Sequence, residues 1–259
     1  MSNSSQKVVV VCDFSERMKE VIVHGVRMAS ILRKELCLAA LWKDKAQKVE
    51  QQEKLFQTLK KLKANLPDMD ISWLLLRKSL HDNMEKLVDD YEAVLVVLHQ
   101  TDIKWALKAF RLSSIAFLFV NGEVPRYLSY KNVLVPIDFR KASKETSLWA
   151  SYFGRFNKSQ VQLIYAHETD PDQANKLMRN LNFFKKFLSS MNVSFQLVAG
   201  KSSSWGIWNE AISKADQWEG DVVIFSGSST ISLIDLIIGL PEKKIIKKAG
   251  EILGKKFVS

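Results

Sequence analysis

The sequence contains few cysteines, and they form no metal-binding pattern. Cys12 and Cys37 are the only two in 259 residues, and both lie in apolar runs. Neither belongs to a Cys-x-x-Cys pair or to a Cys/His arrangement with the spacing of a zinc site. We therefore expect two buried, reduced thiols, with no metal site and no redox motif.

Long apolar stretches are also missing. A membrane-spanning helix needs roughly 18 apolar residues, whereas the best candidate, 231–240, is short and carries Asp235. The apolar run after Lys7 ends at Asp13, too early for a signal peptide, whose apolar region needs about 7 to 15 residues. We expect a cytoplasmic protein that does not insert into membranes.

Signatures of common catalytic sites are absent too. Ser226, Ser228 and Ser229 lack the Gly-x-Ser-x-Gly spacing of a hydrolase nucleophile, and no Ser-Gly-Gly-x-Asp-Ser adenylating loop occurs. His99 and His167 follow apolar runs at points where open α/β sheets hold ligands, but no partner residues complete a catalytic set. We do not expect an enzyme.

The charge is strongly positive, with a formal net value of +10. Basic residues are spread along the chain, with local groups at 60–63 and 243–248. Solvated helix faces explain these groups, and the later one would complement a helix C-terminal dipole. A nucleic-acid-associated protein is the weaker alternative, because no recognisable motif accompanies the charge; steep loss of binding with salt would distinguish it.

Three segments of the first half match segments of the second half in the same order. They are 8–14 on 133–139, 37–41 on 162–166, and 93–98 on 221–226. Such an internal repeat predicts two copies of one domain, 1–125 and 130–259. The join falls near 122–129, where Asn121-Gly122 and Pro125 favour a turn.

Within each half, short apolar runs alternate with amphipathic stretches. The runs predict strands at 8–12, 36–41, 71–76, 94–98 and 115–120, and at 133–137, 161–166, 193–198 and 222–225. The stretches predict helices at 15–33, 47–64, 143–156, 172–190 and 204–217, with Ser143 as an N-cap. The position of the last strand stays undecided between 252–253 and 257–258. This alternation predicts an α/β fold of two tandem Rossmann-like domains, each a five-stranded parallel sheet flanked by helices.

The opening of each half resembles the universal stress protein family. The second half reads Val-Leu-Val-Pro-Ile-Asp-Phe from Val133 to Phe139, and the first reads Val-Val-Val-Val-Cys-Asp-Phe from Val8 to Phe14. The resemblance covers nearly the whole chain and implies the adenine nucleotide alpha hydrolase-like version of the Rossmann-like fold. It places the acids Asp13 and Asp138 near the adenine and ribose of a bound nucleotide. The alternative is that each acid accepts local backbone N–H groups at a strand-to-helix turn, which we favour for Asp13 and leave open for Asp138.

Nucleotide-binding members of the family carry Gly-x-x-Gly, nine residues, then Gly-Ser or Gly-Thr, because glycine lets backbone N–H groups approach phosphate. In the second half Ser226 and Ser229 replace the first two glycines, Gly227 lies one residue out of register, and Gly239 matches the third. The first half has no glycine between Val26 and Val120. The resemblance thus implies at most weak binding of ATP or another adenine nucleotide, in the second half. Its candidate residues are Asp138, Ala166, Ser226, Gly227, Ser229 and Gly239.

The resemblance implies a stress-response regulator or small-ligand sensor that performs no turnover, with a small molecule or a protein as its partner. The alternative is an ATP-binding member with slow ATPase activity. Because family members often pair, we expect the two halves to pack as an intrachain pseudo-dimer, and a homodimer stays open. Trp205 and Trp208, three residues apart, indicate core or interface packing rather than a platform for base stacking.

Overall fold

The computed structural model describes residues 6–99, 102, 106, 108–110, 113–120, 128–218, 220–226 and 256–258. The chain divides into two compact units, Met1–Arg126 and Tyr127–Ser259. The domain limits predicted from the sequence stay predictions, since residues 121–127 lie outside the described part. The packing of one half on the other likewise stays a prediction.

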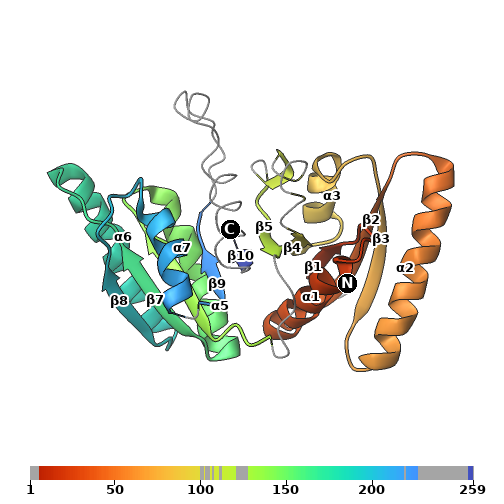
Figure 1. The fold of residues 1–259 in the computed structure, drawn as a ribbon, viewed down its shortest axis with the longest axis horizontal. Coiled ribbons are helices and arrows are strands. Elements are labelled where there is room, and N and C mark those ends of the chain that lie inside the picture. Colours follow the sequence, from red (N-terminus) through yellow and green to blue (C-terminus); the bar gives the residue numbers. More distant parts are fainter. Residues whose placement is uncertain are drawn as a thin grey trace. The chain divides into compact units, whose positions relative to one another are not determined.

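Unit 1 alternates strands with helices (Figure 1). Its elements are β1 (Lys7–Val11), α1 (Met18–Leu32), β2 (Glu35–Trp42), α2 (Lys45–Asn65), β3 (Ile71–Arg77), η1 (His81–Asn83), α3 (Met84–Asp89), β4 (Ala93–His99) and β5 (Ala116–Val120). The strands pair in parallel in the order β3-β2-β1-β4-β5. The valines of β1 are almost completely buried, as expected for a central strand covered on both faces.

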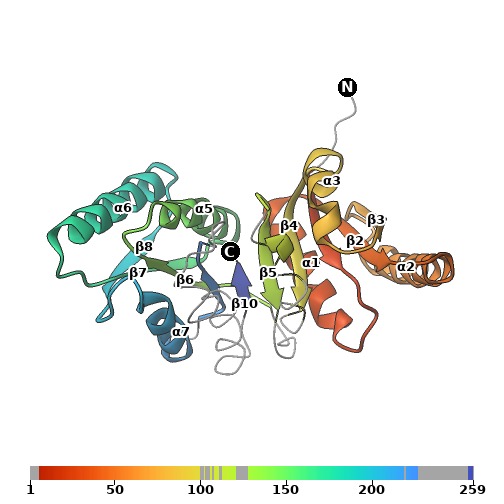
Figure 2. The same cartoon turned by 90° about the horizontal axis from the view of Figure 1, so that it is seen from above.

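Unit 2 repeats this arrangement. Its elements are β6 (Asn132–Ile137), η3 (Lys141–Glu145), α5 (Thr146–Asn157), β7 (Gln160–Tyr165), α6 (Pro171–Ser190), β8 (Phe195–Ala199), α7 (Ile207–Gln217), β9 (Val222–Ile224) and β10 (Lys256–Val258). The strands pair in parallel in the order β8-β7-β6-β9-β10. Helices α5 and α6 cover one face of this sheet and α7 the other (Figure 2).

The sequence repeat is also a repeat of strand pairing. Val8 of β1 pairs with Leu36 and Leu95, and Val133 of β6 pairs with Val161 and Val222. Both valines therefore occupy the same central position, as the sequence predicts. Of the two stretches considered for the last strand, the later one, 257–258, lies within β10.

The turn after β6 differs from the sequence expectation. Ser143 is not the N-cap of a long helix, because Lys141–Glu145 form the 3₁₀ helix η3 and α5 begins only at Thr146. The Ser143 hydroxyl instead accepts the N–H of Asp138 at 3.3 Å, and the Ser143 carbonyl accepts the Thr146 hydroxyl at 2.8 Å. The two hydrogen bonds of Ser143 thus connect the residue that follows β6 with the first residue of α5.

Candidate ligand-binding site

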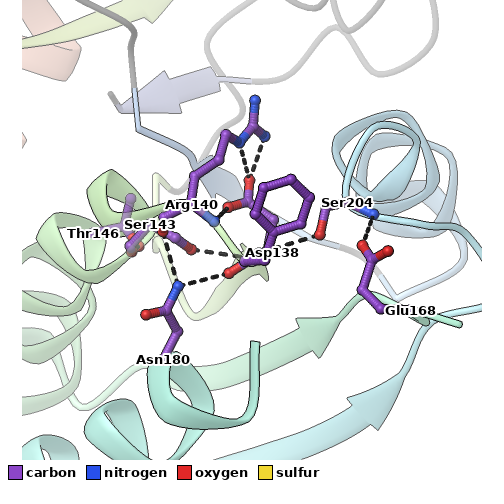
Figure 3. Close-up of polar contacts among 8 residues, drawn as sticks. Asp138, Arg140, Ser143, Thr146, Glu168, Asn180 and Ser204 are labelled. Carbon is purple, nitrogen blue, oxygen red and sulfur yellow. Dashed lines mark hydrogen bonds and ion pairs between the residues drawn. The ribbon is translucent and has the colours of Figure 1, made fainter. Parts of the chain in front are cut away.

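Asp138 directly follows β6 and is completely buried. Its carboxylate is held by the residue two positions later (Figure 3). The N–H of Arg140 donates to Oδ1 at 2.8 Å, and Nε of Arg140 donates to Oδ2 at 2.8 Å. Nη2 of Arg140 also donates to Oδ2. The acid and its counter-ion therefore belong to the same turn, and both carboxylate oxygens are engaged.

Two tryptophans flank the guanidinium of Arg140. Its carbon lies 4.4 Å from the ring centroid of Trp208 and 5.8 Å from that of Trp205. Guanidinium groups bind indole rings through cation–π attraction at such distances. Trp208 is 6% exposed and packs on Phe225, as expected for a core residue, whereas Trp205 is 68% exposed, so core packing does not describe it. The site thus has one buried and one exposed indole.

Side chains from other elements fix the backbone of this turn (Figure 3). Asn180 of α6 is buried and donates from Nδ2 to the carbonyls of Asp138 and Arg140, each at 2.8 Å. The hydroxyl of Ser204 accepts the N–H of Phe139 at 3.1 Å, and the N–H of Ser204 donates to Oε1 of Glu168 at 2.6 Å. The turn is therefore tied both to α6 and to the loop that precedes α7.

That loop is held by Glu210 in the first turn of α7. Its carboxylate accepts the N–H groups of Lys201 at 3.0 Å and Ser202 at 2.7 Å, and Nζ of Lys214 lies 2.8 Å away. Burial opposes the ionisation of Glu210, but these hydrogen bonds outweigh it and lower its pKa to about 2. Gly200 begins the loop, and a Cβ there would lie only 2.8 Å from the Tyr165 carbonyl oxygen. Glycine is thus needed for the close approach of the loop to β7.

No protein-family model matches the sequence, and no curated protein matches it. Comparison with solved structures, in contrast, gives matches over almost the entire chain. A universal stress protein from Archaeoglobus fulgidus is 10% identical, with a TM-score of 0.72 and coverage of 97% of each chain. The chain has the fold of the universal stress proteins.

Two other structures share this universal stress protein fold. A functionally unknown protein from Pseudomonas aeruginosa is 13% identical, with a TM-score of 0.64 and coverage of 98% of this chain and 92% of that one. The cytoplasmic domain of a prokaryotic cation chloride cotransporter is also 13% identical, with a TM-score of 0.60 and coverage of 98% and 94%. Because the cotransporter domain shares the fold, function has to be argued from the site.

The universal stress protein fold brings two of the sequence-predicted site residues together. Asp138 and Ala166 follow the neighbouring strands β6 and β7, and the N–H of Ala166 donates to the Ile137 carbonyl at 3.0 Å. Ala166 is 2% exposed. Ser226 is half-buried and lies two residues after the end of β9, which pairs with β6. The other three candidates, Gly227, Ser229 and Gly239, lie outside the described residues.

The corresponding position of unit 1 is built differently. Asp13 is exposed, and its Oδ1 accepts the N–H of Ser15 at 2.9 Å and the hydroxyl of Ser15 at 2.8 Å. This is the local role favoured for Asp13 from the sequence. In the repeat, Ser15 occupies the position of Arg140. Unit 1 therefore lacks the guanidinium that pairs with the acid in unit 2.

His99 ends β4, which pairs directly with β1. It is buried, and its Nε2 lies 3.8 Å from Oε2 of Glu20. Burial lowers the pKa of His99 and the charge of Arg17 lowers it further, while Glu20 and Asp13 oppose the shift. A buried imidazole that favours its neutral form indicates a structural role. Among the residues that the structure describes, no group of three or more His, Cys, Asp or Glu side chains could hold a metal ion.

Sequence reasoning missed Arg140, Asn180 and Ser204. Arg140 was visible in the motif Asp138-Phe139-Arg140, where a cation follows the acid at a spacing that permits pairing. Asn180 carried a weaker signal, as a buried polar residue within the apolar stripe of α6. Nothing in the sequence connects Ser204 with Phe139, because their contact spans 65 positions.

Proposed function

We propose that this chain is a tandem universal stress protein that acts as a cytoplasmic, non-enzymatic stress-response regulator or small-ligand sensor. Any adenine nucleotide would bind weakly and only to unit 2. The observation that carries this proposal is the contrast between the two acids that follow the first strands. Asp13 is exposed and accepts local hydrogen bonds, whereas Asp138 organises a buried turn with Arg140, Asn180 and Ser204.

The lack of turnover is supported by the chemistry of the Asp138 turn. A general base must reach the proton that it abstracts, and a nucleophile needs an adjacent base. Asp138 is fully buried, and both of its carboxylate oxygens accept hydrogen bonds from Arg140. Glu168 accepts the N–H of Ser204, and Glu210 is held by three partners. The carboxylates of this site therefore serve to position the backbone, which suits a binding site better than a catalytic one.

The similarity to solved structures supports the universal stress protein fold, and the name of the Archaeoglobus fulgidus structure suggests the stress-related role. Among the described residues, no helix has the length and apolar character needed to cross a bilayer. The short last strand β10 and the Asp138 turn both belong to unit 2, the half to which the degenerate glycine motif assigns a weak nucleotide site. These observations support a site in unit 2 without requiring one in unit 1.

Thermal unfolding with millimolar ATP, with and without magnesium, tests the proposal. A ligand at a hundred times its dissociation constant adds about 2.7 kcal/mol, which raises the melting temperature of a protein this size by several degrees. We expect a small rise that Asp138→Ala reduces and the matched variant Asp13→Ala leaves unchanged, with no release of phosphate. A shift abolished by Asp13→Ala but not by Asp138→Ala would overturn the assignment to unit 2. Steady phosphate release would favour a slow ATPase instead.

A further inference from the structure

The charge that the Asp138 turn presents to solvent is positive. A guanidinium has five N–H donors, of which Nε–H and one Nη2–H point to Asp138. Among the described residues no other hydrogen-bond acceptor engages Arg140, and its side chain is 31% exposed while that of Asp138 is 0% exposed. A ligand that enters here meets the outer N–H groups of Arg140 and cannot reach the buried carboxylate. Such a fork of donors matches the oxygens of a carboxylate or phosphate.

The second feature of this surface is the exposed indole of Trp205. At 68% exposure it is the most exposed aromatic residue that the structure describes. Its ring meets the Phe139 ring edge-on, with centroids 6.2 Å apart, and lies beside the Arg140 guanidinium. An indole that offers a face to solvent next to a cation can stack a planar ring whose substituent is anionic.

The backbone beside Trp205 and the side chain of Arg140 are held in place before any ligand arrives. The neighbours of Trp205 are anchored, because the N–H of Ser204 donates to Glu168 and the N–H of Gly206 donates to the Ser203 carbonyl at 2.8 Å. Arg140 is fixed by Asp138 and by the buried ring of Trp208. A preorganised site loses less entropy on binding than a mobile one. Glu168 and Glu210, the acids of this loop region, use carboxylate oxygens to accept backbone N–H groups.

We propose that Arg140 and Trp205 form a subsite for a planar aromatic ligand that bears a phosphate or carboxylate. The anionic group pairs with the outer N–H groups of Arg140, and the ring stacks on Trp205. Asp138 is a positioning residue that holds the guanidinium and does not touch the ligand. This inference rests on the proposed sensor function, for which it supplies the ligand class.

Calorimetric titration of the full chain with four probes tests the subsite. AMP carries ring and charge, adenosine the ring alone, ribose 5-phosphate the charge alone, and anthranilate is an aromatic carboxylate that is not a nucleotide. Trp205→Ala removes a largely exposed side chain, so the fold should persist. The double variant Asp138→Asn/Arg140→Met removes the cation without leaving a buried charge behind. Phe56→Ala, which removes an exposed aromatic ring in unit 1, and Lys141→Met, which removes a neighbouring exposed cation, are the matched controls.

We expect AMP and anthranilate to bind more tightly than either partial probe. Trp205→Ala should weaken AMP roughly tenfold, the range that base stacking on an aromatic residue supports, and Trp205→Phe should restore part of the loss. Asp138→Asn/Arg140→Met should weaken AMP and ribose 5-phosphate but spare adenosine. The controls should bind AMP like the unsubstituted chain.

The outcomes separate this inference from the proposed function. If AMP binds and neither Trp205→Ala nor Asp138→Asn/Arg140→Met weakens it, the subsite is wrong while a nucleotide-binding sensor stands. If anthranilate binds through both residues and AMP does not bind, the subsite stands and the nucleotide part of the proposed function fails. If none of the four probes binds, the subsite is overturned. If the loss of Arg140 strengthens AMP binding, the guanidinium obstructs the site and does not receive the anion.

Discussion

The guanidinium of Arg140 is the counter-ion of Asp138, two residues before it, and its Nε–H donates to Oδ2 at 2.8 Å. This pair distinguishes the two halves of a duplicated chain. The acid occurs in both, but unit 1 has Ser15 at the matching position and uses its hydroxyl instead. The acid therefore pairs with a guanidinium in unit 2 and with a neutral hydroxyl in unit 1.

Removing the cation of this pair alone should destabilise the fold more than removing both charges together. Arg140→Met leaves a fully buried carboxylate without its counter-ion, and we expect a loss of about 3 kcal/mol in the free energy of unfolding. Asp138→Asn/Arg140→Met removes both charges and should lose clearly less. Urea unfolding measures both, with Lys141→Met expected to stay within about 0.5 kcal/mol of the unsubstituted chain. Equal losses for the single and double variants would show that the pair is not coupled.

Asn180 should be important for the stability of unit 2. Asn180→Ala removes the Nδ2 donor of the Asp138 carbonyl in a buried environment, and such a loss costs about 1–3 kcal/mol. The Arg140 carbonyl also loses this donor but keeps the N–H of Ser143 at 3.1 Å. We expect a loss of about 2 kcal/mol in urea unfolding. Asn175→Ala, at an exposed position of the same helix, is the control. Similar midpoints for the two variants would contradict the role assigned to Asn180.

Glu210 should make stability depend on pH in the acid range. Its pKa in the folded chain is lowered to about 2 from an ordinary value of 4.5. The stabilisation is therefore fully present above about pH 4.5 and is lost as the pH falls through about 2. Glu210→Gln should destabilise the chain at neutral pH, and the difference should shrink on acidification. Urea midpoints at several pH values measure this, and a constant difference at every pH would be inconsistent with it.

The two thiols should be unreactive in the folded chain. Burial raises the pKa of Cys37 to about 11, and burial raises that of Cys12 as well. Because the thiolate is the reactive form, Ellman's reagent should label neither residue at mildly alkaline pH, and both in concentrated urea. Rapid labelling of the native chain would show that one of the strands β1 and β2 opens readily.

The central strands of this protein could be predicted well from the sequence because they are buried on both faces. Runs such as 8–12 and 133–137 are apolar without interruption, and they coincide closely with β1 and β6. The helix α3 was missed, because its six residues are too few to show an amphipathic period. The last strand was ambiguous for a similar reason, since β10 has three residues.

The site was predicted only in part. Asp138 was visible because an acid after an apolar strand stands out, and Ala166 was implied by the family resemblance. The ion pair of Arg140 with Asp138 depends on the conformation of a long side chain, which the sequence does not show. The hydrogen bonds of Asn180 and Ser204 to the turn join residues that are 42 and 65 positions apart. The exposure of Trp205 was not anticipated, because spacing alone does not tell which of two nearby indoles faces the core.

The central claim is that one chain holds at most one small ligand, in unit 2. Native mass spectrometry of the full chain with added AMP tests this most directly, because it counts bound molecules on a protein of 29.6 kDa. The account predicts a single added AMP whose bound fraction falls in Trp205→Ala and stays unchanged in Asp13→Ala. Two AMP molecules per chain, or one that survives Trp205→Ala and disappears in Asp13→Ala, would contradict it.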